Sequence, residues 1–127
     1  MPTKVIARNK QEDRNIEFWA ESKDKLSAKG FGCPRYEKRD KKQVAHNYLH
    51  FLETGKFPPN KHKFKQVENE KFFRIAGHQI RLYGDFIGKN CFVVFYCDIK
   101  KQNKMKQSLL EVLRRLHEQM KSELVGD

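Results

Sequence analysis

Two arginines lie close together in a stretch whose pattern predicts paired β-strands. Residues 71–104, KFFRIAGHQIRLYGDFIGKNCFVVFYCDIKKQNK, contain short aromatic and β-branched runs broken by glycine-containing segments, which predicts two consecutive β-hairpins. A turn at Gly77–His78 would place Arg74 directly opposite Arg81. Like charges in this position repel unless an anion lies between them, and guanidinium groups suit phosphate. The pair therefore indicates either a phosphate-binding site or a solvated face that nearby carboxylates neutralise.

The same register, with a second turn at Gly88–Lys89, sorts the side chains onto two faces of the sheet. We expect one face to be the core face, made of Phe73, Ile75, Ile80, Leu82, Val93, Phe95 and Cys97. We expect the other face to carry Phe72, Arg74, Arg81, Tyr83, Val94, Tyr96 and Asp98. Aromatic rings beside cations suit the stacking of nucleic-acid bases, so the second face is the predicted functional surface.

A basic segment precedes the hairpins. Residues 60–67, NKHKFKQV, are predicted to form a strand, with lysines on one side and His62 and Phe64 on the other. The lysines of this strand are Lys61, Lys63 and Lys65. The chain of 127 residues has a formal net charge of +11 and a pI near 9.7. This charge predicts a polyanionic partner, which could be RNA, DNA or an acidic protein.

The elements that position these groups follow from hydrophobic spacing. Residues 4–8 predict an edge strand, residues 9–30 a first helix and residues 37–55 a second helix. A terminal helix is predicted from the stripe Leu109, Leu113, Leu116, Met120 and Leu124. The whole chain, residues 1–127, is expected to be one α+β domain. We expect an antiparallel sheet of three or four strands, with both N-terminal helices on one face and the basic face open.

Cysteine and histidine spacing indicates no metal site. Cys33, Cys91 and Cys97 lack the spacing of metal ligands and are expected to be buried free thiols. His46 and His50 are four residues apart on a predicted helix, but no third ligand lies nearby in the pattern. We therefore expect no metal or cofactor. Neither a signal peptide nor a membrane span is visible in the sequence, so a cytoplasmic location is expected.

The order of the basic motifs resembles a known family. A basic strand with Lys63 and Lys65 is followed by Arg74 in FFRI, Arg81 in IRLY, the strand CFVVFY and the segment KKQNK at 100–104. Together with the linker LETGKFPP, these motifs make residues 52–118 similar to the RelE/HigB superfamily of type II toxins, in particular its phage-derived HigB-like branch. The chain departs from the family pattern at Phe72, at Asp98 and at Met105, where the family commonly has an acidic residue, a small residue and proline, respectively.

The resemblance implies the toxin of a toxin–antitoxin system: a ribosome-dependent mRNA interferase that cuts RNA without a metal or cofactor. In this chemistry the ribose 2′-OH attacks the adjacent phosphate, so the protein must orient RNA, stabilise a pentacovalent phosphate and move protons. The implied catalytic residues are Arg74 and Arg81 at the scissile phosphate, with Lys65, His62, Tyr96 and Asp98 as alternatives for proton transfer. The implied RNA-binding residues are Lys61, Lys63, Tyr83, Lys100, Lys101 and Lys104.

Two other functions are compatible with the same basic face. A nucleic-acid-binding module would use it without cleaving, and a protein-interaction domain would use it to dock an acidic partner. For a toxin, the implied partners are mRNA on the ribosome and a small DNA-binding antitoxin protein, so the interaction function is compatible with the nuclease function.

Overall fold

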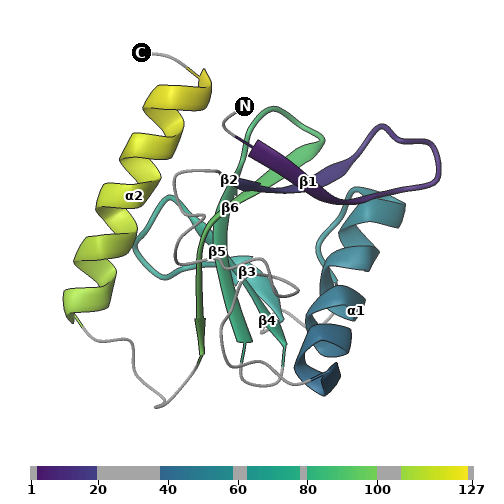
Figure 1. Ribbon diagram of the computed structural model, residues 1–127, viewed down its shortest axis with the longest axis horizontal. Coiled ribbons are helices and arrows are strands. Elements are labelled where there is room, and N and C mark those ends of the chain that lie inside the picture. The colour runs from purple at the N-terminus through teal and green to yellow at the C-terminus, as the bar shows by residue number, and fades with distance from the viewer. Residues whose placement is uncertain (1–2, 20–37, 59–62, 78–79, 100–106, 126–127) are drawn as a thin grey trace.

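The computed structural model describes residues 3–19, 38–58, 63–77, 80–99 and 107–125 (Figure 1). These ranges contain the strands β1 (Thr3–Arg8), β2 (Asn15–Trp19), β3 (Phe64–Gln66), β4 (Phe73–Gly77), β5 (Ile80–Phe86) and β6 (Cys91–Ile99). They also contain the helices α1 (Lys38–Thr54) and α2 (Gln107–Val125). No helix among these residues is long and apolar enough to cross a membrane.

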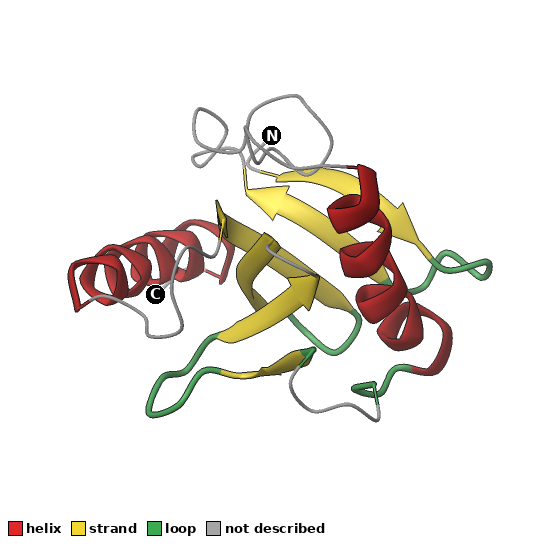
Figure 2. Ribbon diagram, turned by 90° about the horizontal axis from the view of Figure 1, so that it is seen from below, coloured by secondary structure: helices red, strands yellow, loops and turns green. Residues whose placement is uncertain are grey.

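The strands form one six-stranded sheet, in the order β1-β2-β6-β5-β4-β3. Strands β2 and β6 run parallel, whereas every other neighbouring pair is antiparallel. Helix α1 packs mainly against β4, and α2 packs against β5 and β6 on the opposite face (Figures 1 and 2). The α+β class holds, but the expected sheet of three or four antiparallel strands with two N-terminal helices on one face is wrong.

The first predicted helix is wrong because residues 15–19 form strand β2. Ile16 and Phe18 face the α1 side of the sheet, whereas Trp19 packs on the α2 side. Asn9 lies at the start of the β1–β2 turn, where its side-chain oxygen accepts hydrogen bonds from the backbone N–H groups of Asp13 and Arg14, both at 3.0 Å. Pairing with the buried strand β6 thus overrides the local helical spacing. Residues 20–30 lie outside the described ranges.

The other predicted helices and the edge strand are confirmed. Strand β1 lies at the sheet edge. Helix α1 ends at Thr54 and is followed by Gly55, which has a φ of +75° and donates its N–H to Phe51 O at 2.7 Å. The buried Asn47 of α1 donates a side-chain hydrogen bond to the backbone oxygen of Ala76 in β4. This bond fixes α1 over the strand that carries Arg74.

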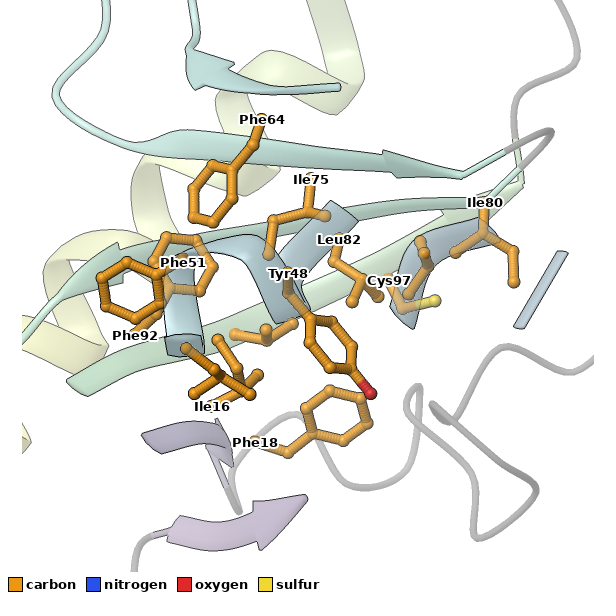
Figure 3. Packing of buried hydrophobic residues seen from close by; sticks show 13 residues of the cluster. Ile16, Phe18, Tyr48, Phe51, Phe64, Ile75, Ile80, Leu82, Phe92 and Cys97 are labelled. Carbon is orange, nitrogen blue, oxygen red and sulfur yellow. The ribbon is translucent and has the colours of Figure 1, made fainter. Parts of the chain in front are cut away.

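Two hydrophobic cores lie on opposite faces of the sheet. The α1-side core consists of Ile16, Phe18, Val44, Tyr48, Phe51, Leu52, Phe64, Ile75, Ile80, Leu82, Phe92, Val94 and Cys97 (Figure 3). The α2-side core consists of Trp19, Phe72, Tyr83, Val93, Phe95, Leu113 and Met120. The stripe of α2 is therefore a core stripe. The face predicted to be open is instead partly covered by α2.

The hairpin registers differ from the predicted ones. Gly77 pairs with Ile80, so Arg74 lies opposite Tyr83 and not opposite Arg81. A β-bulge between β5 and β6 leaves Tyr83 opposite Tyr96 and Gly84 opposite Val94, so Phe95 is the extra residue. Past the bulge the alternation is reversed. Val93 and Phe95 pack on the α2 side and Val94 on the α1 side, each opposite to its predicted face.

The cysteines also differ in part from the prediction. Cys97 is disulfide-bonded, so its assignment as a free thiol is wrong, whereas Cys91 is free. Cys33 lies outside the described residues. The Cys91 thiol contacts a carboxylate oxygen of Glu17 at 3.1 Å. Burial, together with this hydrogen bond, raises the pKa of Cys91 to about 12.

We expect Cys91 to resist alkylation in the folded protein. With its pKa raised from the ordinary 9.0 to about 12, the thiol forms far less of the reactive thiolate at pH 8 than an exposed cysteine does. Peptide mass spectrometry after iodoacetamide treatment at pH 8 should find Cys91 unmodified, and modified once denaturant is present. Glu17→Gln should speed its modification in the folded state. Rapid modification of the folded wild type would contradict the raised pKa of this half-buried thiol.

Candidate nucleic-acid interface

A row of four polar side chains crosses the sheet on the α2 side. Lys65 in β3 pairs with Arg74 in β4, Arg74 pairs with Tyr83 in β5, and Tyr83 pairs with Tyr96 in β6. Directly opposed residues point to the same face, with Cβ atoms roughly 4.5–5.5 Å apart. The rings of Tyr83 and Tyr96 lie 6.5 Å apart between centroids. Four residues from four strands are thus brought side by side.

A second row lies beside the first, toward the β4–β5 turn. Arg81 pairs with Ala76 on one side and with Asp98 on the other. Ala76 also donates its N–H to Lys63 O at 2.8 Å, which places Lys63 at the β3 end of this row. We call the two rows the basic patch, which consists of Lys63, Lys65, Arg74, Arg81, Tyr83, Tyr96 and Asp98.

The shifted register keeps both arginines on the predicted face. The prediction placed Arg74 opposite Arg81, whereas Arg74 pairs with Tyr83, two residues farther along β5. Because side chains alternate between the two faces of a strand, a shift of two residues leaves each side chain on its predicted face. The two arginines are diagonal neighbours, which weakens the repulsion expected for direct opposition. Arg81 is anchored at the adjoining ends of β4 and β5, where its Nη1 donates to Ile80 O at 2.8 Å and Gly77 O at 3.5 Å.

Burial and neighbouring charges shift the pKa values of Arg81, Tyr83 and Tyr96 in the patch. Burial lowers the pKa of Arg81, and the charge of Arg74 lowers it further. Burial also raises the pKa values of Tyr83 and Tyr96, and the negative charge of Asp98 raises both further. The two phenols therefore stay protonated at neutral pH. A protonated phenol donates a hydrogen bond to a phosphate oxygen and is poorly suited to accept a proton.

Accessibility separates the two tyrosines. Tyr83 is only 4% exposed and belongs to the α2-side core, whereas Tyr96 is half-buried at the border of that core. Tyr96 is thus the better base-stacking residue of the two. Phe72 and Val94, which were predicted on this face of the sheet, are buried in the α2-side and α1-side cores, respectively. Neither contributes to the patch.

Seven of the twelve predicted site residues therefore lie together in the patch. The other five, namely Lys61, His62, Lys100, Lys101 and Lys104, lie outside the described ranges. Of the histidines on α1, His46 is exposed and His50 half-buried. Over the described ranges, no three His, Cys, Asp or Glu side chains are placed to hold a metal ion.

A further polar cluster, which the sequence reasoning missed, holds α2 against the sheet. His117 Nε2 lies 2.8 Å from Asp85 Oδ2, and Lys121 Nζ lies 3.6 Å from the same oxygen. Arg114 donates two hydrogen bonds to Glu70, at 2.9 and 2.7 Å. Positions 114, 117 and 121 follow the spacing of one helix flank, which was the available signal.

This cluster borders a groove of about 600 Å³ between α2 and the turn at residues 69–72. The charged groups in the groove wall are largely satisfied by one another, since Glu70 binds Arg114, while His117 and Lys121 share Asp85. The arrangement therefore positions α2 against the sheet, where it packs on the α2-side core that contains Tyr83 and contacts Tyr96.

No family model, curated protein or solved structure matches this chain.

Proposed function

We propose that the protein is a metal-independent endoribonuclease, the toxin of a type II toxin–antitoxin pair that cuts mRNA on the ribosome. The observation that carries the proposal is the patch itself, which collects Lys65, Arg74, Arg81 and Tyr96 on one face of a rigid sheet. Catalytic groups on paired strands are held in a fixed relative geometry. The implied partners are ribosome-bound mRNA and a cognate antitoxin.

The arginines suit the demands of phosphate chemistry. Attack of a 2′-OH on the adjacent phosphate places additional negative charge on the phosphoryl oxygens in the transition state. Arg74 and Arg81, as diagonal neighbours on β4 and β5, present guanidinium groups to one such phosphate. Tyr96 adds a hydroxyl donor, and Lys63 and Lys65 bind the flanking backbone phosphates.

Fewer residues of the basic patch are suited to proton transfer than to phosphate binding. The raised pKa of Tyr96 favours a role as hydrogen-bond donor over one as general base. As the bond from the 2′-oxygen to phosphorus forms, the P–O5′ bond breaks and the departing 5′-oxygen takes up a proton. Lys65, directly opposite Arg74, is the described residue beside the proposed scissile phosphate that can donate this proton. His62 remains a predicted alternative, and its position lies outside the described residues.

One observation favours the alternative function, a nucleic-acid-binding module without cleavage. The raised pKa values keep both phenols of the patch protonated, so they can donate hydrogen bonds and stack on bases but are poor proton acceptors. Binding of single-stranded nucleic acid needs only cations and stacking groups, and no proton acceptor.

Induction of the chain in a bacterium tests the proposal. We expect the wild type to arrest growth and to produce translation-dependent cuts in a reporter mRNA, mapped by primer extension. The Arg74→Ala, Arg81→Ala double variant should lose both effects, with cutting reduced at least about a hundredfold. The matched control is Arg8→Ala with Arg115→Ala, which removes the same charge from two exposed positions. Normal growth and intact mRNA with a folded wild type would overturn the nuclease proposal.

A further inference from the structure

Charge is unevenly distributed across the basic patch. Its cations lie on or next to β3, β4 and β5, and consist of Lys63, Lys65, Arg74 and Arg81. Its carboxylate, Asp98, lies on β6, the strand that also carries Tyr96. A bound strand of RNA would therefore place its phosphates over β3–β5 and direct a base toward β6.

Tyr96 and Asp98 are spaced for contact with one base. They are two residues apart on β6, so their side chains share a face and lie roughly 6.5–7 Å apart along the strand. Both are half-buried and thus partly accessible. The effect of Asp98 on the pKa values of Tyr83 and Tyr96 shows that the carboxylate lies within electrostatic range of both phenols. A base stacked on the Tyr96 ring would extend its edge toward Asp98.

A carboxylate discriminates among bases because it only accepts hydrogen bonds. Guanine presents two adjacent N–H donors on its Watson–Crick edge and can bind a carboxylate in a bidentate manner. Cytosine and adenine present an amino group beside an acceptor, and uracil presents one N–H between two carbonyl oxygens that repel a carboxylate. Asp98 lies opposite Arg81, but a carboxylate has about four lone-pair sites and can bind an arginine and a base together.

We infer that Tyr96 and Asp98 form a nucleobase subsite that takes guanine, with Tyr96 stacking on the base and Asp98 setting the preference. The inference rests on the proposed function in that the ligand is single-stranded RNA. It gives Asp98 a role in specificity in place of the predicted one in proton transfer. The residue that departs from the family pattern then determines which RNA this chain selects.

Fluorescence anisotropy at low salt tests the subsite, using short labelled oligouridylates that carry U, G, C or A at one central position. Wild type should bind the G-containing oligonucleotide about tenfold more tightly than the all-U one. Asp98→Ala should bring this ratio close to one and should tighten binding of the all-U oligonucleotide, because the patch loses its negative charge. Asp98→Asn, which keeps the side-chain shape, should also lose most of the preference. Glu118→Gln, which removes one exposed carboxylate on α2, should keep the ratio.

The possible outcomes separate the inference from the proposed function. Equal binding of all four oligonucleotides by the wild type would overturn the guanine subsite and leave RNA recognition standing. A preference for G that survives in both Asp98→Ala and Asp98→Asn would also overturn it. Failure of every oligonucleotide to bind folded wild type would overturn the subsite together with RNA recognition by the patch.

Discussion

Replacing Gly84 with alanine should lower the free energy of unfolding by about 3 kcal/mol, because the added methyl group has no space. A Cβ at this position would meet the backbone oxygen of Val93 at less than contact distance. It would also lie 2.7 and 2.9 Å from two ring atoms of Phe92. The backbone cannot move away without opening the β5–β6 bulge. Chemical denaturation followed by circular dichroism should show the loss.

Gly88→Ala is the matched control for this prediction. Gly88 has a φ of +75°, but a Cβ there would meet nothing within 4 Å. Its substitution should therefore cost only about 1–2 kcal/mol, from backbone strain alone. Equal losses for the two variants would contradict the close approach of β5 and β6 at Gly84, and the Tyr83–Tyr96 register would then be in doubt.

The bulge explains why the face of each β6 side chain could not be read from the sequence. Alternating hydrophobicity predicts faces only while the ladder is regular and one face is polar. Here Phe92, Val93, Val94 and Phe95 are all buried, so this run is apolar on both faces of the sheet. An extra residue at Phe95 then reverses the alternation without leaving a signal in the pattern. Gly84, which has no side chain to pack, was the one local indication of irregular pairing.

The shared face of the two arginines was predicted correctly, whereas the sheet that carries them was not. Arg74 and Arg81 share one face as predicted, because the register error was an even number of residues, and the pairing of β3 with β4 adds Lys65 to that face. The position of α2 could not be predicted in the same way. Its stripe shows that the helix packs against something, but not which face of the sheet it covers. Strand β2 was missed because Ile16 and Trp19 also fit helical spacing, and only pairing with β6 decides between them.

Replacing Arg81 with lysine should separate cutting from binding. Lysine keeps the positive charge, so RNA affinity should stay within about threefold of wild type. It cannot reproduce the planar guanidinium fork, in which one nitrogen donates to Ile80 O and the other donors would bind the scissile phosphate in the proposed reaction. The rate of cutting should therefore fall about a hundredfold, as when one transition-state donor is lost. Time courses of reporter mRNA cutting, with affinities from fluorescence anisotropy, measure the two effects.

Arg115→Lys makes the same chemical change at an exposed position on α2 and should leave both quantities unchanged. Cutting by Arg81→Lys at the wild-type rate would mean that position 81 contributes charge alone, which contradicts its assignment to the scissile phosphate. Tight binding by wild type and variant, with cutting by neither, would instead identify the patch as a binding surface. The difference matters because a binding surface needs only the sum of its charges, whereas catalysis needs the direction of each hydrogen bond in the transition state.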